Sequence, residues 1–106
     1  MREMSEEKAT DELRIGHLLR VSSYLEIAVI SMWTGSPRTV VTIGMVEACL
    51  RGEGPGGQDE DLLERLRALV GEARDYNADD DFPAAMARMR VAEDLVALYT
   101  IRLTGE

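Results

Sequence analysis

Few side chains in this sequence could carry chemistry, and each lacks the partners that its chemistry needs. His17 and Cys49 are the only histidine and the only cysteine of the chain. Zinc takes four protein ligands, or three and a water molecule, so these two residues are too few for a zinc site. Nucleophilic catalysis likewise needs a third group that positions the base. We therefore expect no catalytic residue, no metal centre and no cofactor, and a half-buried structural role for His17.

Glu26 is the most suggestive acidic residue because it stands inside the most apolar stretch of the chain, residues 22–37. On a helical wheel it lies about 100° from the face that we expect to be the core. One interpretation is a boundary glutamate that pairs with an arginine of a neighbouring helix or subunit. The other is a desolvated carboxylate that faces a pocket. We favour the first, with Glu26 as a contact residue for a partner or ligand.

Glu47 is a second candidate contact residue on an otherwise apolar segment. Arg51 follows it by four residues, which is the favourable spacing and order for a salt bridge within one helix. A di-iron or di-manganese bundle would need inward glutamates and Glu-x-x-His pairs. Arg14 stands three residues before His17, where that glutamate would be. The sequence therefore excludes this class of metal bundle.

The segment "DYNADDDFPAAM" places Asp75, Asn77 and Asp79 at the first, third and fifth positions of an EF-hand-like loop. The sixth position holds Asp80 in place of glycine, and the twelfth holds Met86 in place of the bidentate glutamate. We interpret the segment as an acidic turn that ends a helix. A weak cation site at these three residues is the alternative.

Trp33 and Arg38 flank the expected turn between the first two helices, and these residue types dominate the energetics of protein interfaces. Both are candidate contact residues, although Trp33 could instead be a core residue that closes the end of the bundle. Methionine adapts to irregular ligands. The alternative is therefore an apolar cavity at a dimer interface, lined by Met32, Met45, Met86 and Met89.

The elements that would position these residues are helices. The first is expected from about Ser5 or Thr10 to Thr34, with residues 1–9 frayed, and Gly35 stops it. The second covers residues 37–51, with a short strand over residues 39–43 as the alternative. The sequence "GEGPGG", residues 52–57, reads as a flexible linker.

The third helix begins near Asp59 or Asp61, since Asp61 and Glu64 have the spacing of a capping box. Asp81 caps the fourth helix, and Pro83 lies in its first turn. Short connections favour antiparallel neighbours. The sequence therefore predicts one all-α domain over residues 1–106, a compact four-helix bundle with a long first helix.

The first two helices have more apolar surface than one copy can cover. A helix of 25 to 30 residues is roughly 40 Å long, so it would project beyond a domain of this size unless it breaks near Gly16. The second helix is apolar on both sides, with Val40, Ile43, Val46 and Leu50 on one and Val41, Met45, Ala48 and Cys49 on the other. A helix that is apolar all round must be covered all round. We therefore expect a homodimer formed through the first and second helices.

Charge and composition narrow the class of partner. The formal net charge is −8 over 106 residues, and residues 53–81 alone sum to −7. Such a surface repels phosphate backbones, so we expect no nucleic-acid binding, and the acidic segment could instead dock on a basic protein. A single cysteine, no apolar run of membrane length and no secretory signal indicate a cytoplasmic protein. Eleven arginines to one lysine are typical of a GC-rich bacterial genome.

Two short motifs resemble known families. Residues 33–35, "WTG", resemble the hairpin turn of small WXG-type secreted proteins, and Tyr76 with Asp80 resembles their Tyr-x-x-x-Asp export signal. In that family the signal follows a long second helix, whereas here residues 52–57 interrupt the chain after about fifteen residues. The closing segment "ARDYNADDDF" before "AEDLV" is similar to HEPN-type helical domains, but the residues before His17 lack their nuclease arginine. We assign the chain to neither family.

The sequence thus predicts a small acidic helical protein, without enzymatic activity, that acts by binding another protein. Regulatory, antitoxin, immunity and pathway-accessory roles are all compatible with it. A small-molecule-binding protein or an enzyme of bacterial secondary metabolism that uses the methionine-lined cavity is the alternative. A WXG-like secreted hairpin is a further alternative.

Overall fold

The computed structural model describes residues 2–105, with side chains from Glu6 onward. It contains four α-helices, α1 (Arg2–Trp33), α2 (Thr39–Cys49), α3 (Glu60–Ala78) and α4 (Phe82–Thr104). A 3₁₀ helix, η1 (Pro55–Gly57), lies between α2 and α3. No strand occurs among these described residues, and residues 39–43 belong to α2. The expected all-α four-helix fold is confirmed, and the alternative of a strand is wrong.

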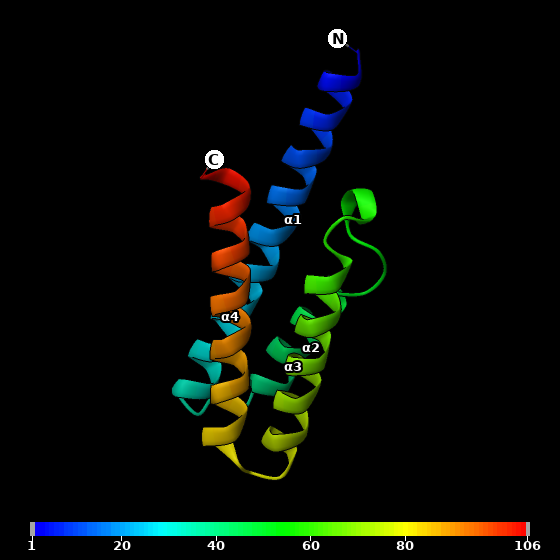
Figure 1. The fold of residues 1–106 in the computed structure, drawn as a ribbon. Helices are drawn as coiled ribbons and strands as arrows, with labels where there is room; N and C mark the ends of the chain where they lie inside the picture. The colour runs from blue at the N-terminus through cyan, green and yellow to red at the C-terminus, as the bar shows by residue number, and fades with distance from the viewer. Residues whose placement is uncertain (1, 106) are drawn as a thin grey trace.

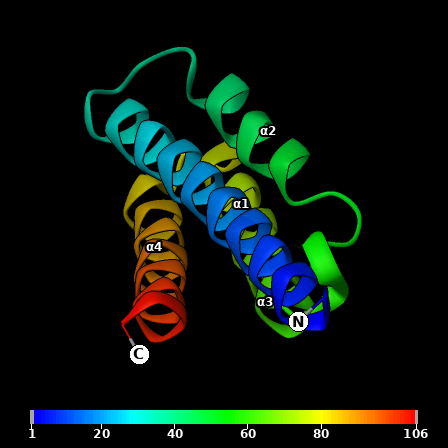
Figure 2. The ribbon, with the colours of Figure 1, turned by 90° about the horizontal axis from the view of Figure 1, so that it is seen from above.

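The helices follow one another around the bundle (Figure 1). Helix α1 packs against α2 and α4, while α3 packs against α4 and, more lightly, against α2. Seen from above, α1 crosses diagonally between α2 on one side and α4 on the other (Figure 2). The core is formed by one apolar stripe from each helix, including Leu18, Val21, Leu25, Ile43, Val46, Leu63, Leu66, Val70, Met89 and Val96. One side of α1 and one side of α2 therefore face away from the core.

Local sequence signals explain most helix ends. Gly35 has a φ of 67°, a left-handed conformation that glycine adopts without strain, and it ends α1 as expected. The Asp81 side chain accepts a hydrogen bond from the backbone N–H of Ala84 at 3.3 Å, so the expected cap of α4 is confirmed. Helix α2 begins at Thr39, two residues later than expected. The Ser36 hydroxyl accepts from the Arg38 N–H in the preceding turn.

Helix α3 begins where the sequence predicts, but its capping differs from the expectation. Asp59 occupies the cap position, and Asp61 lies inside the first turn, so the predicted capping box of Asp61 and Glu64 is wrong. The Asp59 side chain makes no cap hydrogen bond. It is buried and turns toward α1, where it contacts Arg14.

Helix α1 runs unbroken through Gly16, so the alternative of a break at that residue is wrong. The described chain measures 54 × 25 × 20 Å, and the N-terminal turns of α1 project past the other helices (Figure 1). Residues 52–57 include η1, which packs against α1, and Gly54 is buried there. The fraying of residues 1–9 and the flexibility of residues 52–57 remain predictions.

By length and composition alone, α1 could cross a membrane. Its segment Glu6–Trp33 reaches a mean hydropathy of 1.2 over an 18-residue window, of which 28% is buried inside the bundle. A core helix of a soluble protein also reaches this value, and one side of α1 forms the core here. The expectation that the chain does not interact with membranes therefore remains a prediction.

Candidate functional site

The predicted cation residues do not form a binding loop. Asp75 and Asn77 lie in the last turns of α3, and Asp79 is the residue that follows it. Because two residues along a helix differ by about 200° in direction, the side chains of Asp75 and Asn77 diverge. No group of three or more histidine, cysteine, aspartate or glutamate side chains within residues 6–105 could hold a metal ion. The interpretation of the segment as a helix end agrees with this geometry.

His17 and Cys49 meet, but as structural neighbours. The His17 Nε2 atom lies 3.0 Å from the backbone carbonyl oxygen of Cys49, which joins the middle of α1 to the end of α2. The His17 Nδ1 atom is buried and finds no hydrogen-bond partner in the described part of the chain. Burial raises the pKa of the Cys49 thiol despite the nearby charge of Arg20, which makes it a poor nucleophile at neutral pH.

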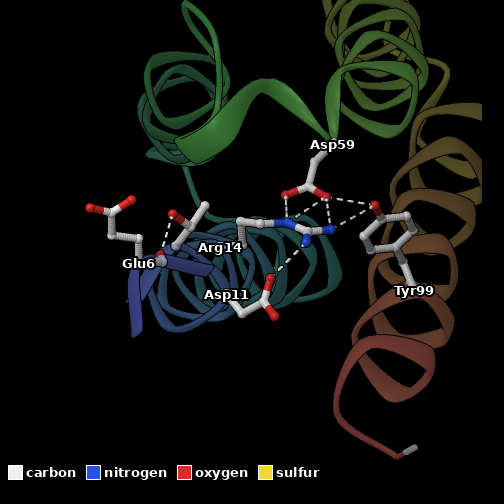
Figure 3. A network of polar contacts seen from close by, with 6 residues as sticks. Glu6, Asp11, Arg14, Asp59 and Tyr99 are labelled. Atoms are coloured by element: carbon white, nitrogen blue, oxygen red, sulfur yellow. Dashed lines mark hydrogen bonds and ion pairs between the residues drawn. The ribbon is translucent and has the colours of Figure 1, made fainter. Parts of the chain in front are cut away.

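The one buried ionic network of the described residues joins three helices (Figure 3). Arg14 of α1 donates through Nη2 to Asp59 Oδ1 at 2.8 Å and through Nε to both carboxylate oxygens at 3.2 Å. The Tyr99 hydroxyl of α4 donates to Asp59 Oδ1 at 2.5 Å. Asp11, one turn before Arg14, accepts from Nη1 at 2.9 Å. The network ties α1, the start of α3 and the last turns of α4 together.

The charges in this network stabilise one another. Burial by itself would raise the pKa of Asp59, but hydrogen bonds from Arg14 and Tyr99 and the charge of Arg14 hold it below its ordinary value. The hydrogen bond to Asp59 raises the pKa of Arg14 despite its burial. Burial and the hydrogen bond to Asp59 raise the pKa of Tyr99, which therefore remains a donor. Both Asp59 oxygens and the Tyr99 hydroxyl are hydrogen-bonded within the protein, so we interpret the network as a structural clamp.

Glu26 is exposed and faces a shallow groove of about 390 Å³ between α1 and α4. The groove is also lined by Arg90, Glu93 and Asp94. Burial raises the pKa of Glu93, and the nearby charge of Glu26 raises it further. Glu26 therefore lies at the edge of the outward side of α1 and not in a desolvated pocket.

Glu47 pairs with a different arginine from the one expected. Its Oε2 atom accepts from Arg74 Nη1 of α3 at 2.9 Å, and this pair joins α2 to α3. No ion pair between Glu47 and Arg51 occurs among the described residues, although both line the same surface groove. The expected salt bridge within α2 is thus replaced by one between helices, because Glu47 points toward α3.

The four methionines do not line one cavity in a single copy. Met89 is fully buried, and Met32 is nearly so at the end of the bundle. Met45 is exposed and lies in a groove between α1 and α2, on another side of the molecule from the groove that Met32 borders. The predicted cavity would lie at a dimer interface, so this alternative stays a prediction.

Two apolar surfaces remain, and the first is a groove at the end of the bundle, which we call the end groove. It lies where the α1–α2 turn meets the α3–α4 turn and has a volume of about 570 Å³. Trp33, Val40 and Phe82 line it, together with Met32 and Asp80. The Trp33 side chain is 75% exposed and Phe82 is 51% exposed, so the alternative of a core tryptophan is wrong.

The second surface, which we call the outer face, covers the sides of α1 and α2 that point away from the core. Its exposed residues are Leu19, Arg20, Ser23, Ile27 and Ile30 of α1 and Val41, Met45 and Ala48 of α2. A groove of about 430 Å³, lined by Arg20, Tyr24, Met45 and Ala48 among others, joins the two helices there. Arg20 is the one charged residue among these eight, and the exposed Glu26 directly precedes Ile27 and lines a groove together with Ile30.

Comparison with known protein families, with curated proteins and with solved structures finds no match to this chain. The geometry can be compared with the resemblance to WXG-type proteins. Helix α2 has 11 residues against 32 in α1, so "WTG" does not join two long helices as in a WXG-type hairpin. Tyr76 of the export-like motif is half-buried, and the Arg88 guanidinium lies 5.2 Å from its ring centre.

Proposed function

We propose that the chain is a homodimeric helical protein that acts by binding another protein and not by catalysis. The observation that carries the proposal is the outer face, where Leu19, Ile27 and Ile30 of α1 and Val41 of α2 are exposed, with Arg20 among them and Glu26 at the α4 side. Exposed apolar surface of this kind marks interaction sites. Charged residues are depleted at the cores of protein interfaces, which is the composition found here.

A second copy is the partner that this face fits best. Each copy carries a formal charge of −8, so two copies repel one another except where acidic groups are absent. None of the eight residues named for the outer face is acidic, and Glu26, which shares a groove with Ile30, lies on the α4 side of this face. The small residues Ser23 and Ala48 would allow a facing helix to approach closely. A twofold dimer would therefore bury the outer face against itself and cover the apolar side of α2.

Helix α4 also exposes apolar residues, but its surface is a weaker candidate. Val91, Leu98 and Ile101 are exposed on its outward side. Arg90, Asp94 and Arg102 are interspersed with them on the same helix. Burying these charges would cost free energy unless each found a partner. The α4 surface thus remains available to solvent in the proposed dimer.

The remainder of the surface would be free to bind another protein, in a regulatory, antitoxin-like, immunity-like or accessory role in a bacterial cytoplasm. The absence of a metal cluster within residues 6–105 and the structural use of His17 and Cys49 fit a role in binding. The first test is the mass of the purified chain by sedimentation equilibrium at micromolar concentration. We expect about twice the 11.8 kDa of one copy. A mass of one copy throughout the micromolar concentration range would reject the homodimer.

A further inference from the structure

We infer that the end groove binds a basic segment of a partner protein, which inserts an apolar side chain between Trp33 and Phe82 and places lysine or arginine against Asp79, Asp80 and Asp81. This inference rests on the proposed role in protein binding, and it assigns that role a place and a partner chemistry. It does not depend on the homodimer, because the end groove lies outside the outer face.

The apolar part of the groove would hold an anchor side chain. Its volume of about 570 Å³ lies within the range of roughly 300–1,000 Å³ that is usual for ligand-binding clefts. Trp33 and Phe82 come from different turns of the chain and line the same groove while remaining half or more exposed. Aromatic side chains with this exposure gain most when a partner covers them, and tryptophan is enriched at the centres of interfaces.

The charges around the groove select a basic partner. The segments 32–40 and 77–82 form the groove and its edges, and they contain three acidic residues, Asp79, Asp80 and Asp81. Arg38 is the one basic residue of these segments. Asp79, Asp80 and Asp81 are all exposed, and Asp80 lines the groove directly.

The helix dipoles at the end groove do not change the sign of its electrostatic potential. Helices α1 and α3 end here, at Trp33 and Ala78, and helices α2 and α4 begin here, at Thr39 and Phe82. The negative C-terminal ends and the positive N-terminal ends of the helix dipoles therefore oppose one another. The aspartate side chains set the charge of the site, apart from the contribution of Asp81 to capping α4.

Other occupants fit less well. Nucleic acids and anionic lipid surfaces would bring phosphate groups toward the aspartates. A second copy would bring the same acidic edge, since its groove carries the same residues. A basic segment with an apolar anchor is favoured by both features of the groove, and the long aliphatic stems of lysine and arginine can lie on apolar surface while their charges reach the aspartates.

The test uses Trp33, the only tryptophan of the chain, as an intrinsic fluorescent reporter. The full-length protein is titrated with a short synthetic peptide that has a central Leu-Leu pair and two lysines on either side. Two matched peptides replace the lysines by glutamates or the leucines by alanines. We expect the lysine–leucine peptide to shift the Trp33 emission to shorter wavelength and to bind at least tenfold more tightly than either matched peptide.

The variants separate the two features of the groove. Asp79→Asn with Asp80→Asn should weaken binding of the lysine–leucine peptide about threefold to tenfold, since exposed charge pairs each contribute about 0.2–1 kcal/mol. Asp61→Asn with Glu64→Gln changes the net charge equally at the other end of α3 and should leave binding unchanged. Phe82→Ala should remove most of the preference for leucine over alanine.

Several results would overturn the inference. These are equal affinity for the lysine and glutamate peptides, no binding of the lysine–leucine peptide up to millimolar concentration, or an equal loss in the Asp61→Asn, Glu64→Gln control. Circular dichroism of each variant distinguishes lost binding from lost folding. If the peptide fails to bind while the mass remains that of a dimer, the end-groove inference falls and the homodimer stands.

Discussion

At the scale of single residues, the strongest polar interaction of the molecule is structural. Asp59 is buried at the start of α3 and receives hydrogen bonds from Arg14 of α1 and Tyr99 of α4. Burying two charges is costly, and the close geometry offsets this cost only while both partners remain. The clamp therefore specifies where the projecting half of α1 meets the rest of the bundle.

Removing one partner of this clamp should strongly lower the free energy of unfolding. We expect Asp59→Asn to lower the free energy of unfolding by about 3 kcal/mol, because the buried Arg14 charge loses its buried counter-charge and keeps only the half-exposed Asp11. Tyr99→Phe removes the hydroxyl that donates to Asp59 and accepts a longer hydrogen bond from Arg14, and it should cost about 1 kcal/mol because no charge is left without a partner. Urea denaturation followed by circular dichroism measures both. A loss below that of Tyr99→Phe for Asp59→Asn would contradict the clamp.

Asp59 should make the free energy of unfolding depend on pH in the acidic range. The folded-state pKa of Asp59 lies below its ordinary value of 3.8. A depressed folded-state pKa contributes stability above the unfolded pKa, and this contribution is lost as the pH falls through the folded value. The difference in free energy of unfolding between the wild type and Asp59→Asn should hold constant from pH 7 to about pH 5 and shrink below pH 4. Denaturation curves at these pH values measure it, and a constant difference down to pH 2 would speak against the assignment.

One of the two charged partners of this network could have been recognised from the sequence, and the other could not. Arg14 lies four residues before Leu18 and seven before Val21, so the helical period places it on the core face of α1. A charge on a core face requires a buried partner, and this could have been predicted. The identity of the partner could not, because Asp59 is 45 residues away and was considered only as a possible start of the third helix.

At the scale of the elements, interactions within one turn of the backbone were sufficient to predict most helix ends. Gly35, Asp81 and Pro83 act within one turn of the backbone, and the helices end or begin where these residues indicate. The start of α3 was predicted but its capping was not, because a tertiary contact takes the Asp59 side chain away from the cap. The partner of Glu47 was missed for the same reason, since Arg74 belongs to another helix.

The cap of α4 gives a prediction at this scale. Asp81→Ala removes the acceptor for the Ala84 N–H and should lower the free energy of unfolding by about 1 kcal/mol. Asp81→Asn keeps a side-chain acceptor and should lose at most a few tenths of that amount. Thermal unfolding of both variants at one protein concentration measures the difference. Equal losses for the two variants would indicate that the charge of Asp81 matters and not its cap.

At the scale of the whole molecule, the excess of apolar surface was visible in the sequence, but its arrangement was not. The length of the first helix and the two apolar sides of the second predicted uncovered surface, and Ile27, Val41 and Met45 are exposed in the structure. The end groove could not be predicted, because it unites Trp33 with Phe82 from two turns that are distant in the sequence. Which side chains flank a turn is a local property, whereas which turns meet is set by the packing of all four helices.

The account depends most on the outer face being an interface between two copies. The direct test is sedimentation equilibrium of two matched double variants. Ile27→Glu with Met45→Glu places charges on the outer face, at residues that are 43% and 39% exposed. Val91→Glu with Leu98→Glu places the same charges on α4, at residues that are 44% and 57% exposed.

We predict that the outer-face variant sediments as one copy of about 11.8 kDa, because two glutamates per copy cannot be buried against their counterparts. The α4 variant should retain the mass of two copies, and both variants should keep the helical circular dichroism of the wild type. A monomeric α4 variant beside a dimeric outer-face variant would contradict the account.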